Sequence, residues 1–277
     1  MSLQKQNILL LGAGGRECTL AWKLRSSPLC GELFIAPGNA GTSAYGTNLP
    51  LSVKDFDGIR KACIDLNIDI ILPGPEDPLV AGIYDFVKAD PALQHIIVAG
   101  PSANGAQLEG SKAFSKKFME RHNIPTAAYR EFTADNYAEG EAYIANHPTP
   151  VVIKADGLAA GKGVVIAATT EEALDAYRAM IQDRQFGDAS SRVVIEQFLD
   201  GIELSVFAFT DGTHYVLLPE AKDYKRIGEG DKGLNTGGMG AISPVPFADD
   251  SIMQKVIDRI VNPTVNGLRT EGIIYHG

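Results

Sequence analysis

The chain has 277 residues, of which 45% are hydrophobic and 21% are charged, and its formal net charge is −9. This acidic balance argues against a nucleic-acid-binding surface, which needs clustered Lys and Arg, and no stretch approaches the roughly 18 apolar residues of a membrane span. The three cysteines form no C-x-x-C pair, so neither a disulfide framework nor a zinc site is expected, and a cytoplasmic location fits.

The first hundred residues alternate between short apolar runs and helical patterns. The predicted strands are 7–11, 32–36, 68–72 and 95–99, and the predicted helices are 16–26, 55–66 (with Asp55 as N-cap) and 78–88. Strands separated by helices predict a parallel sheet, in which ligands bind at the carboxyl ends of the strands. Those ends are the segments 12–17, 37–41 and 74–77.

From about Lys112 the pattern changes to that of a separate α+β region. Helices are predicted at 111–121 and 170–180, and strands at 151–155, 163–168, 193–196, 203–209 and 214–219. Some gaps between these strands are too short for a helical crossover, so antiparallel pairing is expected there.

The first glycine cluster, 12–17, follows a predicted strand and opens a predicted helix, which favours an anion at the turn. A dinucleotide site is one interpretation, but the third glycine of that fingerprint is missing. Ala36 and Pro37 also stand where an acidic residue would hold a ribose. A phosphosugar site and a tight turn without any ligand are the alternatives.

The second cluster, 151–163, places Lys154 inside an apolar strand that runs into a glycine-rich segment with a second lysine, Lys162. The spacing is not that of a P-loop, and Gly163 stands where a P-loop has Ser or Thr. Because another strand follows, we expect a glycine-rich hairpin that folds over phosphates as a flap. The alternative for Lys154 is a lysine at a strand edge that points to solvent.

Two further segments carry polar groups. In 193–205, the backbone at 196–198 is suited to read an adenine edge and Glu203 to accept from ribose hydroxyls, although the segment taken alone favours an ordinary turn at Asp200 and Gly201 with solvated acids. In 223–240, many glycines and alternating charges suggest a mobile loop around a polar substrate, or a disordered surface loop.

These elements together, in this order, resemble the ATP-grasp superfamily and, more narrowly, the glycinamide ribonucleotide synthetases (phosphoribosylamine–glycine ligases). The matching strings are G-G-R-E (14–17), A-P-G-N-A-G (36–41), G-P-E (74–76), G-S-K-A-F (110–114), K-A-D-G-L-A-A-G-K-G (154–163), E-Q-F-L-D-G-x-E (196–203), D-Y-K-R (223–226) and N-T-G-G-M-G (235–240). They are spread over nearly the whole chain.

The resemblance implies ATP as cosubstrate with Mg²⁺ or Mn²⁺, and it assigns roles to individual residues. The expected ATP contacts are Lys112, Lys154, Gly157, Gly161, Lys162, Gly163, Glu196, Phe198, Leu199 and Glu203. The expected catalytic set, around glycine and the reacting phosphate, is Lys154, Asp223, Lys225, Arg226 and Asn235. Other substrate contacts, mostly to phosphoribosylamine, are expected from Gly14, Gly15, Arg16, Glu17, Gly38, Asn39, Gly41, Gly74, Pro75, Glu76, Thr236, Gly237 and Gly238.

The implied fold class is α/β: an N-terminal Rossmann-like parallel-sheet domain followed by an α+β ATP-grasp domain that is truncated at its C-terminus. We expect a substrate domain at 1–104, a connecting helix at 105–125, a small ATP-grasp subdomain with the flap at 126–197, and part of the central subdomain at 198–277. The implied activity is ligation of glycine to phosphoribosylamine in de novo purine biosynthesis, by a monomer.

Two departures from the family pattern bear on this reading. Cys18 stands where the family usually has a histidine after G-G-R-E. The string that brings the family's metal ligands is absent before Gly277, so no metal ligand is assigned and a fragment is expected. The alternatives are a sibling ATP-grasp ligase for another substrate, a nicotinamide-dependent dehydrogenase and an inactive nucleotide-binding fragment.

Overall fold

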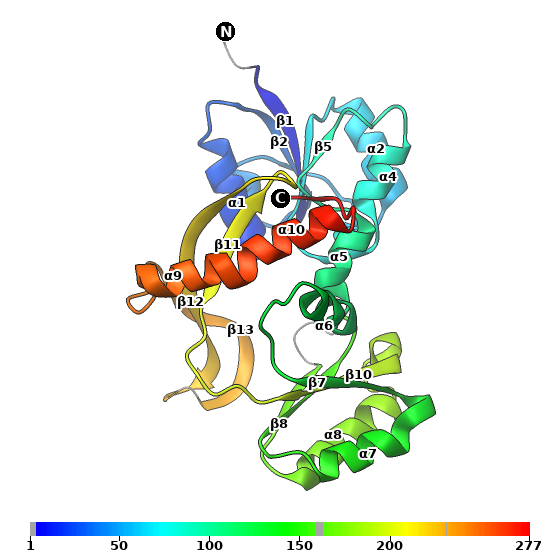
Figure 1. Cartoon of the computed structure of the whole chain (residues 1–277). Coiled ribbons are helices and arrows are strands. Elements are labelled where there is room, and N and C mark those ends of the chain that lie inside the picture. The colour runs from blue at the N-terminus through cyan, green and yellow to red at the C-terminus, as the bar shows by residue number, and fades with distance from the viewer. Residues whose placement is uncertain (1–3, 159–162, 231) are drawn as a thin grey trace. The chain divides into compact units, whose positions relative to one another are not determined.

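The computed structural model describes residues 4–158, 163–230 and 232–277. The chain separates into two compact units, one running through Glu109 and including Glu271–Gly277, the other formed by Gly110–Thr270 (Figure 1). Among the described residues, no helix is long and apolar enough to cross a membrane.

The first unit is built on a five-stranded parallel sheet of order β3-β2-β1-β4-β5, as the alternating pattern predicted. Its strands are β1 (Gln6–Gly12), β2 (Cys30–Pro37), β3 (Thr47–Asn48), β4 (Ile70–Pro73) and β5 (Ile97–Val98), and its helices are α1 (Gly15–Arg25), α2 (Phe56–Asp65), α3 (Asp77–Val80) and α4 (Ile83–Ala89). The single helix predicted over 78–88 was wrong: Gly82 has φ +93, a left-handed conformation that separates α3 from α4.

Both faces of this sheet are buried, because successive side chains of a strand point to opposite faces. Leu9 and Leu11 of β1 belong to the core cluster that also holds Ile59 of α2 and Ile83 of α4. Ile8 and Leu10 belong to a second cluster with Ala21 of α1. A parallel sheet covered on both faces leaves only its strand ends available to a ligand.

A two-stranded antiparallel sheet completes the first unit. It pairs β6 (Gly100–Pro101) with β14 (Tyr275–His276), and α5 (Ala103–Gly110) follows β6. The amide of Ser102 donates to the carbonyl of Ile274 over 3.0 Å. The residues 271–277 therefore fold with the N-terminal unit, although the whole second unit lies between them in sequence.

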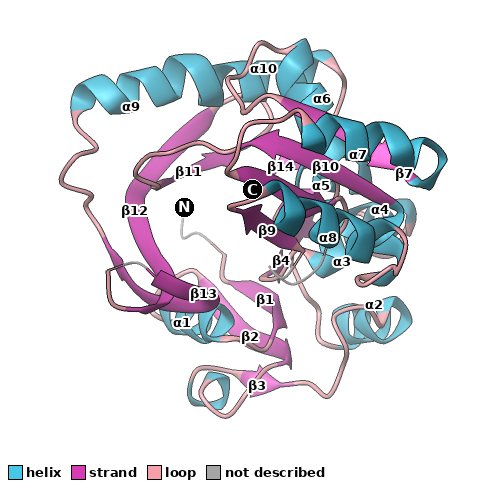
Figure 2. Ribbon diagram, turned by 90° about the horizontal axis from the view of Figure 1, so that it is seen from below, coloured by secondary structure: helices cyan, strands magenta, loops and turns pink. Residues whose placement is uncertain are grey.

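The second unit contains an antiparallel sheet of order β7-β10-β8-β9. Its strands are β7 (Tyr129–Thr133), β10 (Arg192–Gln197), β8 (Val151–Ala155, as predicted) and β9 (Val164–Ala167). The helices α7 (Tyr137–Ala145) and α8 (Thr170–Ile181) pack side by side on one face of it (Figure 2). β8 and β9 form the predicted antiparallel hairpin around the glycine-rich segment.

Tyr177 of α8 is the largest fully buried side chain beneath this sheet. Its ring stacks on that of Tyr137, with centroids 4.9 Å apart, and meets the ring of Phe132 edge-on at 6.1 Å. Gly140 of α7 leaves room for it, because a Cβ at that position would lie 2.0 Å from the Tyr177 hydroxyl. This aromatic cluster therefore packs α7 and α8 against each other.

The second unit also contains a three-stranded antiparallel sheet, which consists of β11 (Ser205–Thr210), β12 (Tyr215–Gly228) and β13 (Lys232–Ile242). Further helices of this unit are α6 (Lys112–Arg121), α9 (Asp250–Val256), a short π-helix (Ile257–Val261) and α10 (Asn262–Thr270). The expected mobile loop over 223–240 was wrong. Of the described residues in this range, all but Glu229 and Gly230, which form a turn, lie in β12 and β13, which pair from Lys222 with Ile242 to Gly228 with Lys232.

Asp211, in the turn between β11 and β12, is expected to make the stability of the fold depend on pH. The amides of Thr213 and His214 donate to Asp211 Oδ1 over 2.8 and 2.6 Å, and these bonds lower the pKa of Asp211 to about 2. A carboxylate with a lowered pKa stabilises the fold above its unfolded pKa of about 4, and this contribution is lost as the pH falls through 2. We expect the stability difference between the wild type and Asp211→Ala, measured by urea unfolding, to shrink from pH 4 to pH 2. A difference that is constant over this range would contradict the assignment.

Candidate active site

The carboxyl ends of β1 and β4 meet where the strand order of the first sheet reverses, which is the usual ligand position in such sheets. Gly12 ends β1 with φ +129, and its carbonyl accepts from the amide of Gly38 over 3.0 Å. The amide of Gly74 donates to the carbonyl of Leu11 over 2.8 Å. Three predicted glycine-rich segments are therefore joined here by backbone hydrogen bonds.

Glu17 and Arg16, both expected to contact substrate, are held by these same segments. Glu17 is 5% exposed, and its carboxylate accepts from the amide of Gly14 over 2.5 Å. A Cβ on Gly74 would lie 2.1 Å from Glu17 Oε1, so only glycine fits there without displacing the carboxylate. Arg16 donates from Nη1 to the carbonyl of Gly74 over 2.7 Å. In the structure, both side chains therefore hydrogen-bond to the backbone of the predicted substrate segments.

Asn39 joins the loop after β2 to the loop after β1. Its Nδ2 donates to the carbonyl of Ala13 over 2.8 Å, and its Oδ1 accepts from the amides of Gly41 and Thr42. Cys18 lies against this loop, since a Cβ on Gly41 would sit 2.8 Å from its sulfur. The residue at the family's histidine position therefore packs on the predicted substrate loop.

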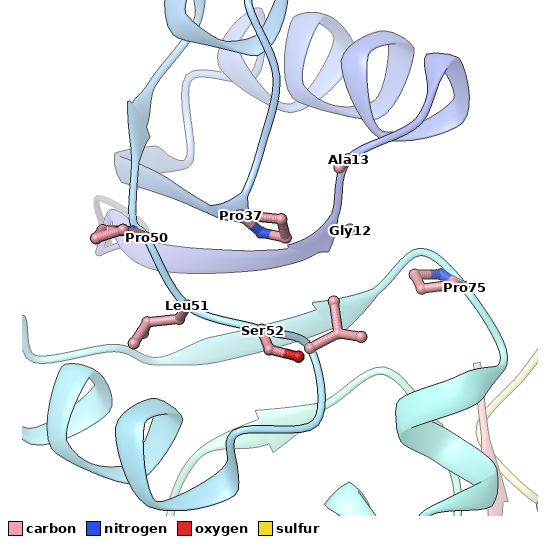
Figure 3. A pocket seen from close by; sticks show the side chains of 8 residues that line it. Gly12, Ala13, Pro37, Pro50, Leu51, Ser52 and Pro75 are labelled. Carbon is pink, nitrogen blue, oxygen red and sulfur yellow. The ribbon is translucent and has the colours of Figure 1, made fainter.

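Two cavities flank Pro75. One, of about 560 Å³, is mostly apolar and is lined by Gly12, Ala13, Pro37, Pro50, Leu51, Ser52, Val53 and Pro75 (Figure 3). The other, of about 360 Å³, is more polar and is lined by Arg16, Gly74, Pro75, Glu76, Leu79, Val80, Pro101, Ala106, Glu109 and Tyr275. Arg16 and Glu76, both expected to contact substrate, thus share a cavity with residues of α3, α5 and β14 that were not predicted.

In the second unit, Lys154 lies on β8, a strand bordered by β10 and β9, so it is not on an edge of the sheet. Its Nζ donates to Glu196 Oε2 over 2.8 Å. The same carboxylate oxygen lies 3.4 Å from Nζ of Lys116 on α6. Two cations therefore share one buried carboxylate, and the cluster carries an excess positive charge suited to a polyanion.

The base of the glycine-rich hairpin is fixed to the start of α6. Asp156 accepts from the amide of Ala113 over 2.7 Å and from the hydroxyl of Ser111, the N-cap of this helix. Lys112 Nζ donates to the carbonyls of Asp156 and Gly157 at 3.3 and 3.2 Å. Lys112 is thereby directed toward the base of the hairpin.

Charged residues of β12 meet Glu203, which precedes β11. Lys225 Nζ donates to Glu203 Oε1 and lies 3.3 Å from Asp223 Oδ2, and the bond to Glu203 raises the pKa of Lys225. Thr236 of β13 donates to the carbonyl of Lys225 over 2.8 Å and accepts from the amide of Gly238. Arg226 pairs with Asn235 across the two strands. The structure thus brings together the expected ribose ligand and most of the expected catalytic set.

For the remaining predicted residues, the structure gives mainly their position and exposure. Leu199 is exposed and Phe198 half-buried in the segment that connects β10 with β11, and Gly15 opens α1. Gly163 is buried and its carbonyl accepts from the amide of Ala155 over 2.8 Å. Gly237 lies exposed on β13. Gly161 and Lys162 lie outside the described residues.

The described residues offer no assembled metal site, because no group of three or more His, Cys, Asp or Glu side chains in them is arranged to hold an ion. Two buried side-chain oxygens of the described residues have no hydrogen-bond partner, the Tyr137 hydroxyl and Asp223 Oδ1, and of these only Asp223 Oδ1 belongs to the predicted site. A single carboxylate oxygen does not define a metal site, so no chemical step is assigned to a metal here.

Sequence reasoning missed Lys116, Asp156, Glu109 and Tyr275. Lys116 had a signal, since it lies three residues after Ala113 and both face the buried side of α6. Asp156 lay inside the recognised hairpin string. Tyr275, whose pKa is raised by burial and by Glu109, had no local signal, because it enters its cavity from the far end of the chain.

Comparison with known proteins adds independent evidence. The family model described as phosphoribosylglycinamide synthetase, N domain, matches residues 6–109, and that of the ATP-grasp (A) domain of the same family matches residues 110–277. Phosphoribosylamine–glycine ligases from Yersinia pestis and Haemophilus influenzae are 46% and 47% identical over 98% of this chain and 62% of their own length. A crystal structure of phosphoribosylamine–glycine ligase from Thermotoga maritima is 34% identical, with a TM-score of 0.82, over 98% of this chain and 63% of that one. The chain thus spans about three-fifths of these relatives.

Proposed function

Because the chain belongs to the phosphoribosylglycinamide synthetase family, we propose that it carries out or takes part in the ATP-dependent ligation of glycine to 5-phosphoribosylamine. The products are glycinamide ribonucleotide, ADP and phosphate, in de novo purine biosynthesis. The observation that carries the proposal is the cluster of Lys154, Glu196 and Lys116 beside a glycine-rich hairpin. This arrangement suits a nucleoside triphosphate and has no role in a nicotinamide-dependent dehydrogenase.

The reaction needs an activated carboxylate. A carboxylate oxygen of glycine attacks the γ-phosphorus of ATP, the bond from phosphorus to the β,γ-bridging oxygen breaks, and ADP leaves. The amine nitrogen of phosphoribosylamine then attacks the carbonyl carbon of glycyl phosphate, loses a proton, and expels phosphate. Phosphoryl transfer of this kind is accelerated mainly by positioning and by neutralising charge, so lysines and backbone donors are the expected parts.

In this proposal, Lys154 and Lys112 neutralise the triphosphate, and the hairpin that includes Gly157 and Gly163 closes over it and excludes water from the acyl phosphate. The backbone at Glu196 and Phe198 receives adenine, with Leu199 at its edge. Glu203 accepts from the ribose hydroxyls, which requires its bond to Lys225 to be exchanged.

Asp223, Lys225, Arg226, Asn235, Thr236, Gly237 and Gly238 are assigned to glycine and the reacting phosphate. Asp223 supports this role because its Oδ1 is a buried acceptor without a partner, which suits a cationic group such as an ammonium. Gly14, Gly15, Arg16, Glu17, Gly38, Asn39, Gly41, Gly74, Pro75 and Glu76 are assigned to phosphoribosylamine, by direct contact or by shaping the cavities beside Pro75. Mg²⁺ or Mn²⁺ would neutralise the triphosphate further. A cytoplasmic monomer is the form that we propose.

The proposal is tested by ADP release from the purified chain with MgATP, glycine and freshly generated phosphoribosylamine, with each omitted in turn. We expect release that requires all three. Stimulation by a different carboxylate would identify a sibling ATP-grasp ligase instead. ATP binding without any release would contradict the ligation activity and favour a nucleotide-binding role alone.

A further inference from the structure

Lys116 is a buried lysine to which the proposed reaction assigns no contact with a substrate. It is 6% exposed, on the inner side of α6. Its Nζ donates to Thr126 Oγ1 over 2.7 Å and to the carbonyl of Ala127 over 3.2 Å, and it lies 5.4 Å from the centre of the Tyr129 ring. Burial lowers the pKa of Lys116, and the neighbouring Glu196 opposes this effect. These contacts fix the ammonium in one position.

Glu196 Oε2 is the atom that joins Lys116 to Lys154. It lies 3.4 Å from Lys116 Nζ and 2.8 Å from Lys154 Nζ. The three side chains differ in accessibility: those of Lys116 and Glu196 are 8% and 7% exposed, whereas that of Lys154 is 26% exposed. Only Lys154 therefore has access to a ligand, and the other two remain behind it.

A buried carboxylate needs a partner. If Lys154 turned toward a triphosphate and Glu196 had no second cation, the Glu196 carboxylate would be left unpaired in the interior. The free-energy cost of that unpaired charge would weaken nucleotide binding. Lys116 removes that cost because it is held by Thr126 and Ala127, independently of Lys154. Its positive charge also prevents Lys154 and Glu196 from forming a neutral pair with little attraction for an anion.

We propose that Lys116 is a positioning residue that serves as the resident counter-ion of Glu196, so that Lys154 is free to bind the phosphates of the nucleotide. The inference rests on the proposed nucleotide binding and deepens it. The alternative is a purely structural role, in which Lys116 connects α6 to the segment before β7 and does nothing else. The two roles differ in one respect: a counter-ion affects phosphate binding, whereas a structural connection affects stability alone.

The test compares the dissociation constants of ATP and adenosine, measured by calorimetry, in the wild type and in Lys116→Met. We expect ATP binding to weaken by a factor on the order of 10–100, with adenosine affinity changed less than about twofold, because only the phosphates draw Lys154 away from Glu196. In Lys116→Met/Glu196→Gln most of the ATP affinity should return, since no carboxylate is left unpaired. The matched control is Thr126→Val, which loosens the structural connection but keeps the charge and should leave the ratio of the two affinities unchanged.

Equal losses for ATP and adenosine in Lys116→Met, or no recovery in the double variant, would overturn the counter-ion role. If Lys116→Met does not fold, Glu196→Gln alone provides the test: ATP affinity should equal or exceed that of the wild type, and a tenfold loss would refute the inference. A wild-type chain that does not bind ATP would instead refute the proposed function, before any variant is compared.

Discussion

Lys154→Ala is expected to lower the turnover of the proposed ligation by a factor on the order of 10²–10⁴, the range found for positioned groups that stabilise charge in phosphoryl transfer. Lys154 is the accessible cation of its cluster, and its loss leaves Glu196 paired only with the buried Lys116. Turnover is measured as ADP release with all three substrates at saturation.

The matched control is Lys61→Ala. The side chain of Lys61 is 77% exposed and, among the described residues, its ion pair is with Asp65 on the same helix, so turnover should not change. Near-wild-type turnover in Lys154→Ala would refute its assignment to the nucleotide phosphates. Loss of activity together with loss of the folded circular-dichroism spectrum would show damage to the sheet instead.

Tyr177→Ala is expected to lower the free energy of unfolding by about 3–5 kcal/mol, because it removes a fully buried ring from the packed core of α7 and α8. Tyr137 would lose its stacking partner, and the space left beside Gly140 is bounded by helix backbone, which collapses poorly. The measurement is urea unfolding followed by circular dichroism at neutral pH.

Tyr177→Phe separates the ring from its hydroxyl. The hydroxyl donates to the carbonyl of Tyr137 over 3.3 Å, so its removal should cost only about 0.5–1.5 kcal/mol. If the two variants lost equal stability, the hydroxyl rather than ring packing would be the main contribution of Tyr177.

The sequence predicted best those elements whose pattern is local and strong. The strands β1 and β8 are apolar runs that end at glycine or lead into a glycine-rich segment, and both lie within a residue of their predicted bounds. The mobile loop over 223–240 was wrong because its glycines signal a loop, whereas in the structure β12 provides a pairing partner along most of that length. Likewise β7 was missed, since the five residues Tyr129–Thr133 are stabilised mainly by pairing with β10, more than fifty residues later.

For the candidate site, sequence reasoning located the segments better than the interactions of individual side chains. Lys154 was identified correctly as a non-edge lysine because apolar residues surround it in the sequence. That its partner is Glu196, and that Lys116 shares this partner, depends on three elements distant in the sequence meeting at one atom. Similarly, the burial of Glu17 under Gly74 follows from the crossing of two loops, which no local spacing reveals.

The pairing of β14 with β6 has a consequence for the order in which the chain acquires its structure. Ser102 bonds to Ile274, a separation of 172 residues, so the first unit cannot complete this small sheet until translation has passed the whole second unit. A nascent chain would carry the five-stranded sheet and α5 with β6 unpaired until residues 271–277 have been made. Closing this long connection is entropically costly and slow, so residues 271–277 should become protected from hydrogen exchange late in refolding, after the central strands of the same unit.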